Sequence, residues 1–110
     1  MENKANNSIT DFINSLRQGQ RLPQANILIG QAIMALSDVK KEQNYKIGGQ
    51  WILDNAHKPQ HEIDQYVSAL FNKLAAGNEK VEKITKDLAK GLDQTTADNL
   101  IAELLEITIS

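Results

Sequence analysis

Two histidines stand four residues apart near the middle of the chain, at a spacing typical of metal ligands. His57 and His61 would share one face of a continuous helix, as pairs of zinc ligands often do. Pro59 lies between them, however, and proline favours the start of a helix, which would leave His57 outside. No other histidine or acidic cluster completes a tetrahedral set, and cysteine is absent. The sequence therefore predicts no metal site and no cofactor, and it assigns both histidines to capping, surface or interface positions.

Three carboxylates flank the same segment, namely Asp54, Glu62 and Asp64. Paired carboxylates act as acid and base only where their environments separate their pKa values. The sequence shows no such separation, and Glu62 and Asp64 suit the first turn of a helix, where negative charge is favoured. A serine nucleophile has no support either, because no Gly-x-Ser-x-Gly pattern is present. We therefore predict no catalytic residue and a protein that is not an enzyme.

Trp51 is the only tryptophan, and it follows a Gly48-Gly49 pair. One interpretation makes it a core residue that joins a short helix to the rest of the fold. The other makes it an exposed anchor, because tryptophan and tyrosine bury a large area at interfaces at little entropic cost. Both interpretations stay open from the sequence. The partner-binding residues that the second one predicts are Tyr45, Trp51, His57 and His61.

Positive charge is slightly concentrated in the first half of the chain. Residues 1–60 carry a net charge of +2 and residues 61–110 a net charge of −4. The basic side chains that could form a diffuse surface are Arg17, Arg21, Lys40, Lys41, Lys46 and Lys58. Sequence-specific nucleic-acid binders usually carry a stronger basic footprint. This balance disfavours nucleic acid as the partner, although a nucleic-acid-associated regulator stays the alternative function.

Two local patterns resemble nucleotide or nucleic-acid sites only superficially. Gly48-Gly49 lacks the spacing of a phosphate-binding loop, and no strand precedes it. Residues 86–106 have the layout of a helix-turn-helix. The second helix of that pair contains no Lys or Arg and carries three acidic residues, unlike a helix that faces phosphates. We therefore interpret residues 86–106 as a structural hairpin.

Apolar residues recur at helical spacing through almost the whole chain. A Ser8-x-x-Asp11 cap predicts a first helix from about residue 9 to residue 18. Residues 24–36 are apolar on more than one face, which is typical of a buried central helix. Gly30 lies inside this helix, and close approach of a neighbouring helix would offset its cost of about 1 kcal/mol relative to alanine. The helix either continues through residues 40–42 or restarts at residue 37.

The second half of the chain predicts shorter helices separated by glycines. Residues 44–49 form the clearest break, and a short helix should follow them and end near residue 56. Pro59 should open a helix that reaches residue 76, with Gly77 beyond its end. Asn78 should cap a helix over residues 79–90, and Gly91 should end it. A Thr95-x-x-Asp98 cap predicts a last helix to about residue 107.

These elements predict an all-α fold: a compact single-domain bundle of five to six helices, several of them short, around a buried central helix. We expect a disordered N-terminus over residues 1–7, one helical domain over residues 8–107 and a frayed end over residues 108–110. The apolar positions that should form the core are Phe12, Ile13, Leu16, Ile29, Ile33, Leu36, Ile52, Ile63, Val67, Leu70, Phe71, Leu74, Ile84, Leu88, Leu100, Ile101 and Leu104.

Composition narrows the function further. No apolar run reaches the roughly 18 residues of a membrane span. The absence of cysteine fits a reducing cytoplasm. In size and helix content the chain is similar to small bacteriocin-immunity bundles, although its acidic balance departs from their basic character. We therefore predict a cytoplasmic, non-catalytic protein-binding module of the inhibitor, immunity, anti-defence or adaptor type, whose partner is another protein. A homodimer through one exposed apolar helix face is also compatible with the sequence.

Overall fold

The described part of the chain folds entirely into helices and the turns between them. The computed structural model describes residues 4–18 and 22–109, and side chains from Ile9 onward. The helices are α1 (Lys4–Leu16), α2 (Pro23–Lys40), α3 (Gln43–Asp54), α4 (Gln60–Leu74), α5 (Glu79–Ala89) and α6 (Gln94–Ile109). The prediction of an all-α bundle of five to six helices is confirmed.

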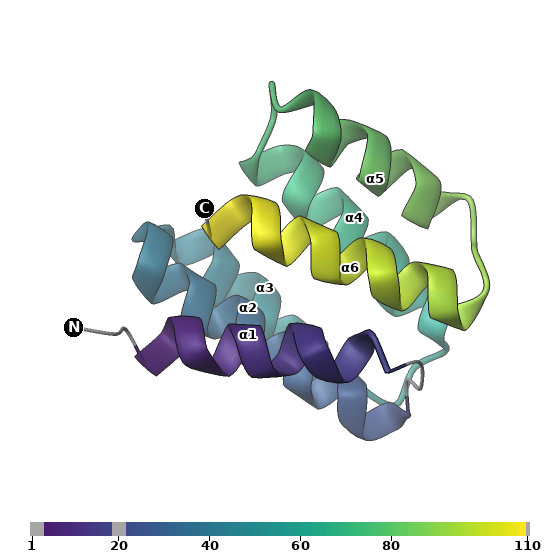
Figure 1. The fold of residues 1–110 in the computed structure, drawn as a ribbon, viewed down its shortest axis with the longest axis horizontal. Coiled ribbons are helices and arrows are strands. Elements are labelled where there is room, and N and C mark those ends of the chain that lie inside the picture. The colour runs from purple at the N-terminus through teal and green to yellow at the C-terminus, as the bar shows by residue number, and fades with distance from the viewer. Residues whose placement is uncertain (1–3, 19–21, 110) are drawn as a thin grey trace.

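Helices that follow one another in the chain pack together, and α6 joins the two halves. α2 packs against both α1 and α3, whereas α4 packs against α5. Figure 1 shows α6 crossing the middle of the molecule between α1 and α5. α6 contacts four other helices: α1, α2, α4 and α5. Both α6 and the inward face of α2 contribute buried residues to the interior. The outward face of α2 is exposed at Ile27 and Leu28.

One continuous core connects all six helices. The residues predicted for it are buried, except Leu70, Leu74 and Leu100, which are half-buried and pack against its edge. Burial also extends to residues that the prediction did not include: Ile9, Ala32, Tyr45, Ala56, Val81, Ala97, Ala102 and Leu105. Four of these are alanines: Ala32, Ala56, Ala97 and Ala102.

The largest correction concerns Gly48 and Gly49. They do not break the chain but lie buried within α3, which begins at Gln43. A methyl group on Gly49 would lie 2.7 Å from the carbonyl oxygen of Gly30, and one on Gly30 would lie 2.9 Å from the carbonyl oxygen of Gly49. The two backbones therefore approach where side chains are missing. The close approach predicted for Gly30 is confirmed, and its partner is the segment interpreted as a break.

Two chain-end boundaries also differ from the prediction. α1 begins at Lys4 rather than near residue 9, so Ser8 lies inside the helix instead of capping it. α6 extends to Ile109 rather than ending near residue 107, and Thr108 is buried. The hydroxyl of Thr108 donates to the carbonyl oxygens of Leu104 and Leu105 within the same helix. The predicted ends at residues 1–3 and 110 lie outside the described residues.

The turns are set by a few residues. α2 continues to Lys40 and ends where Lys41 adopts a left-handed conformation, with φ of 53°. Pro59 is the residue before α4 rather than its first residue. Asn78 caps α5 as predicted, accepting from the amides of Lys80 and Val81.

The cap of α6 also differs from the prediction. The side chain of Asp93 accepts from the amide of Thr96, so the cap lies two residues before the predicted Thr95. Thr95 itself lies inside α6, which begins at Gln94. Asp98, the other member of the predicted cap, is fully buried.

Candidate partner-binding surface

Trp51 lies in the last turn of α3 and stacks on Tyr66 of α4. The two ring centroids are 3.9 Å apart and the ring planes are inclined by 12°. Both side chains are half-buried at the edge of the core. The ammonium of Lys58 lies 5.7 Å from the centroid of the Trp51 ring, within the range of a cation–π interaction. Trp51 thus combines a fixed orientation with an accessible edge.

The turn between α3 and α4 sets this geometry. α3 ends at Asp54, and the Asn55 side chain donates to the carbonyl oxygen of Trp51 at 2.7 Å. The chain then reverses, and α4 begins at Gln60. Tyr66 lies on the second turn of α4, where the reversal places it against Trp51. Partial burial raises the pKa of Tyr66 above its ordinary value, so its hydroxyl stays neutral at physiological pH.

The outer face of α3 continues this surface. Ile47 lies one helical turn before Trp51, and 59% of its surface is exposed. A hollow of about 440 Å³ is lined by Gln43, Lys46, Ile47, Gln50, Trp51 and Asp54. Gln50 donates to the Asp54 carboxylate at 3.0 Å, and this hydrogen bond orients both polar side chains at the edge of the hollow. We call Ile47, Trp51, Tyr66 and Lys58 the α3 surface: an apolar centre with a lysine beside it.

The structure separates the four residues predicted to bind a partner. Trp51 is half-buried, whereas His57 and His61 are exposed. Tyr45 is only 4% exposed, and its ring packs against Phe71 with the centroids 5.6 Å apart. Tyr45 faces the interior because it shares the buried face of α3, and its placement on the surface is corrected.

Tyr66 is a residue of this surface that the sequence interpretation missed. It lies three residues after Ile63 and four before Leu70, next to the apolar stripe of α4. Its position beside that stripe was the only available signal. The stacking partner could not be assigned, because it depends on the path of the turn between α3 and α4.

The two histidines lie on either side of the residue that precedes α4. His57 lies in the turn before α4 and His61 in its first turn, separated by Pro59. Within residues 4–18 and 22–109, no group of three or more histidine, aspartate and glutamate side chains could hold a metal ion. Asp64 is buried and accepts from Gln60 at 3.4 Å, which is a structural contact within α4.

The hairpin of α5 and α6 packs one face of α6 into the core. α6 lies in the middle of the bundle and buries Ala97, Asp98 and Ile101 from its first half. Its other face is exposed, and the charged side chains on that face, Glu103 and Glu106, are acidic, which disfavours contact with phosphates. One basic side chain of the first half of the chain, Arg17, pairs with Glu106 of α6 at 2.7 Å.

Comparison of the chain with protein-family models, with curated proteins and with solved structures returned no match in any of the three. In the described part of the chain, no helix is both long enough and apolar enough to cross a membrane. Any function must therefore be argued from the surface itself.

Proposed function

We propose that this chain is a non-catalytic protein-binding module of the inhibitor, immunity, anti-defence or adaptor type, and that it binds through the α3 surface. The observation that carries the proposal is the half-exposed Trp51, held by Tyr66 and flanked by the exposed Ile47. Interface hot spots are enriched in tryptophan and tyrosine that are already oriented before binding. A stacked ring loses little rotamer freedom when a partner covers it, so more of the contact energy appears as affinity.

The composition of the surface also favours a protein partner over nucleic acid. Its centre is aliphatic and aromatic, and its rim mixes Lys46 and Lys58 with Asp54. Such mixed charge is typical of protein interfaces with an apolar centre and a polar rim. A surface that follows a phosphate backbone would carry positive charge almost alone. A cytoplasmic location is part of this proposal, because the cysteine-free sequence suits a reducing compartment.

The test is capture of the partner from nuclease-treated lysate of the native host, read by mass spectrometry. The decisive variant is Ile47→Gln, because Ile47 is exposed and its replacement should leave the fold intact. Leu28→Gln is the matched control, since Leu28 is an exposed aliphatic residue on α2, beside α1. We expect one stoichiometric protein with the natural chain and the Leu28 variant, and its loss with Ile47→Gln. Trp51→Ala should also abolish capture, with circular dichroism used to check that α3 still packs on α4.

Other outcomes would contradict the proposal. Retention of the partner by Ile47→Gln would exclude the α3 surface as the binding site. Recovery of nucleic acid alone, and only without nuclease, would favour the nucleic-acid-associated regulator, whose binding should fall steeply with added salt. A dimer in sedimentation that dissociates in Ile47→Gln would identify a second copy as the occupant.

A further inference from the structure

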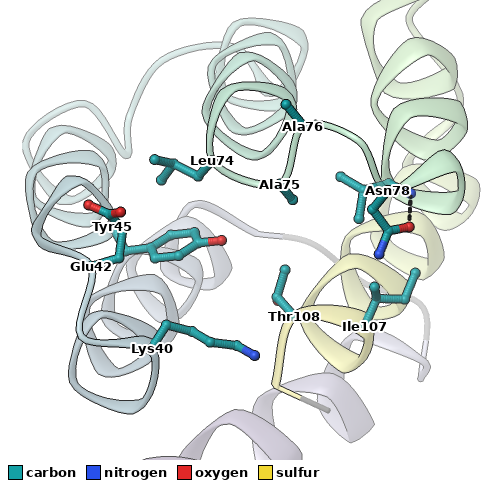
Figure 2. A pocket seen from close by; sticks show the side chains of 10 residues that line it. Lys40, Glu42, Tyr45, Leu74, Ala75, Ala76, Asn78, Ile107 and Thr108 are labelled. Atoms are coloured by element: carbon teal, nitrogen blue, oxygen red, sulfur yellow. Dashed lines mark hydrogen bonds between the residues drawn. The ribbon is translucent and has the colours of Figure 1, made fainter.

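A second feature lies away from the α3 surface, where the ends of five helices meet. The end of α2, the start of α3, the turn between α4 and α5 and the end of α6 enclose a pocket of about 400 Å³. This volume is within the range of natural small-molecule sites. Figure 2 shows Tyr45 entering from α3 with its hydroxyl in the middle of the pocket, between Ala75 and Thr108.

The Tyr45 hydroxyl is held in a fixed place and is open to the pocket. Only 4% of the surface of Tyr45 is exposed, and its ring packs against the ring of Phe71. Among the described residues, nothing forms a hydrogen bond with this hydroxyl, which is aimed into the pocket. The oxygen is not among the buried polar atoms that lack a partner, so it is open to solvent or to a ligand in the pocket. The arrangement leaves a fixed hydrogen-bond donor facing open space.

The electrostatics of the pocket select the charge of what it would bind. Burial, and then the nearby Glu42, raise the pKa of Tyr45, so the hydroxyl remains a neutral donor at physiological pH. The ammonium of Lys40 points toward the same space from the end of α2. The Glu42 carboxylate lies on the other side of the Tyr45 ring from its hydroxyl. One cation and one donor favour a single negative charge, whereas Glu42 and the carbonyl end of α6 disfavour a more highly charged anion.

The remaining wall is mixed: Asn78 and Thr108 are polar, and the other lining side chains are aliphatic. Leu74 and Ala75 of the α4 end, Val81 of α5 and Ile107 of α6 line it. We propose that this pocket binds a small monocarboxylic acid with an apolar body, whose carboxylate accepts from the Tyr45 hydroxyl and pairs with Lys40. The apolar body then lies against these four side chains. This site is independent of the α3 surface, so either proposal can fail without the other.

The test uses benzoate as the probe and benzamide as its neutral counterpart of the same shape. Two-dimensional amide NMR of the full chain should show saturable shifts at Tyr45, Ala75 and Thr108 with benzoate. Benzamide should bind at least about fivefold more weakly, because it cannot pair with Lys40. Tyr45→Phe removes only the hydroxyl and should weaken benzoate binding about tenfold.

Lys40→Gln provides the second variant and keeps the test informative if Tyr45→Phe disturbs the fold. It should weaken benzoate binding about threefold or more, since Lys40 is exposed. Lys86→Gln is the matched control, because Lys86 is an exposed lysine of α5 outside the pocket, and it should leave binding unchanged. Absence of saturable shifts with benzoate, equal binding of benzamide, or unchanged affinity in both Tyr45→Phe and Lys40→Gln would overturn the proposal.

Discussion

The α2–α3 and α4–α5 hairpins hold neighbouring helices together by opposite means. In α2–α3, Gly30 and Gly49 remove side chains so that the two backbones touch. In α4–α5, large apolar side chains fill the space, and Ser68 of α4 donates across it to the carbonyl oxygen of Thr85. The first contact should therefore be intolerant of added atoms, and the second intolerant of removed ones.

The largest effect should come from removing volume on the α4 side. Phe71 is fully buried and also contacts Tyr45 of α3. Phe71→Ala should reduce the free energy of unfolding by about 3–5 kcal/mol, because it removes buried surface and leaves a cavity. Urea denaturation followed by circular dichroism measures this loss. Phe71→Leu, which keeps most of the volume, should lose less than half as much, and equal losses would mean that volume is not what matters here.

The next largest loss of stability should come from adding a single methyl group in the α2–α3 hairpin. Gly49→Ala would place its methyl 2.7 Å from the carbonyl oxygen of Gly30. Separation of the two backbones should cost about 1–3 kcal/mol, even though alanine favours a helix more than glycine does. The same urea titration measures it.

Gly48→Ala is the matched control in the same helix. The three atoms nearest to its methyl would all belong to the side chain of Leu70, which is half-buried and can move. We expect it to lose less than half of what Gly49→Ala loses. If the two alanine variants are equally stable, the backbone contact between α2 and α3 is not as close as described.

Substitutions in the turns of the two hairpins should change the free energy of unfolding by smaller amounts, and in opposite directions. Asn78 caps α5 through its side chain, whereas the α2–α3 turn depends on the left-handed Lys41. Asn78→Ala should cost about 1 kcal/mol, since two amides lose their acceptor. Lys41→Gly should instead be neutral or slightly stabilising, because glycine adopts positive φ without strain. Thermal unfolding of both variants checks the two signs together.

The smallest effect is a pH dependence at the point where the hairpins meet. The pKa of Tyr45 is raised by burial and by Glu42, so in the folded state it keeps its proton at a pH where the unfolded chain loses it. Stability should therefore be fully present below a pH of about 10 and fall as the pH rises above it. Tyr45→Phe should flatten this alkaline decline in urea titrations at a series of pH values. A decline of equal slope in that variant would assign it to other groups.

Periodicity predicted the side-chain contacts well and the backbone contact poorly. Ile63, Val67 and Phe71 form a stripe that the sequence shows directly, and they are buried. The low helix propensity of Gly48 and Gly49 favours a break in the chain. The penalty is only about 1 kcal/mol for each glycine, and tertiary contact overrides it. The signal was present nevertheless: Tyr45, Gly48, Gly49 and Ile52 have the i, i+3, i+4, i+7 spacing of a buried face, once glycine is counted as a packing residue.

The candidate site was predictable only in part. Trp51 was singled out because it is a lone tryptophan, but its stacking partner depends on a turn whose path local sequence does not set. Tyr45 was placed beside Trp51 because the two are close in sequence. Residues six apart in a helix point to different sides, and the structure places one inward and the other at the surface.

The short connection between α2 and α3 also bears on the order of folding. Only Lys41 and Glu42 separate the two helices, so their contact requires the closure of a very small loop. Contacts between residues close in the chain form rapidly, whereas the contact of α1 with α6 must bring together segments from opposite ends of the chain. In kinetic terms, the glycine crossing belongs to the part of the chain that we expect to assemble first, and the docking of α6 completes the fold. Gly49→Ala should accordingly slow folding more than it speeds unfolding.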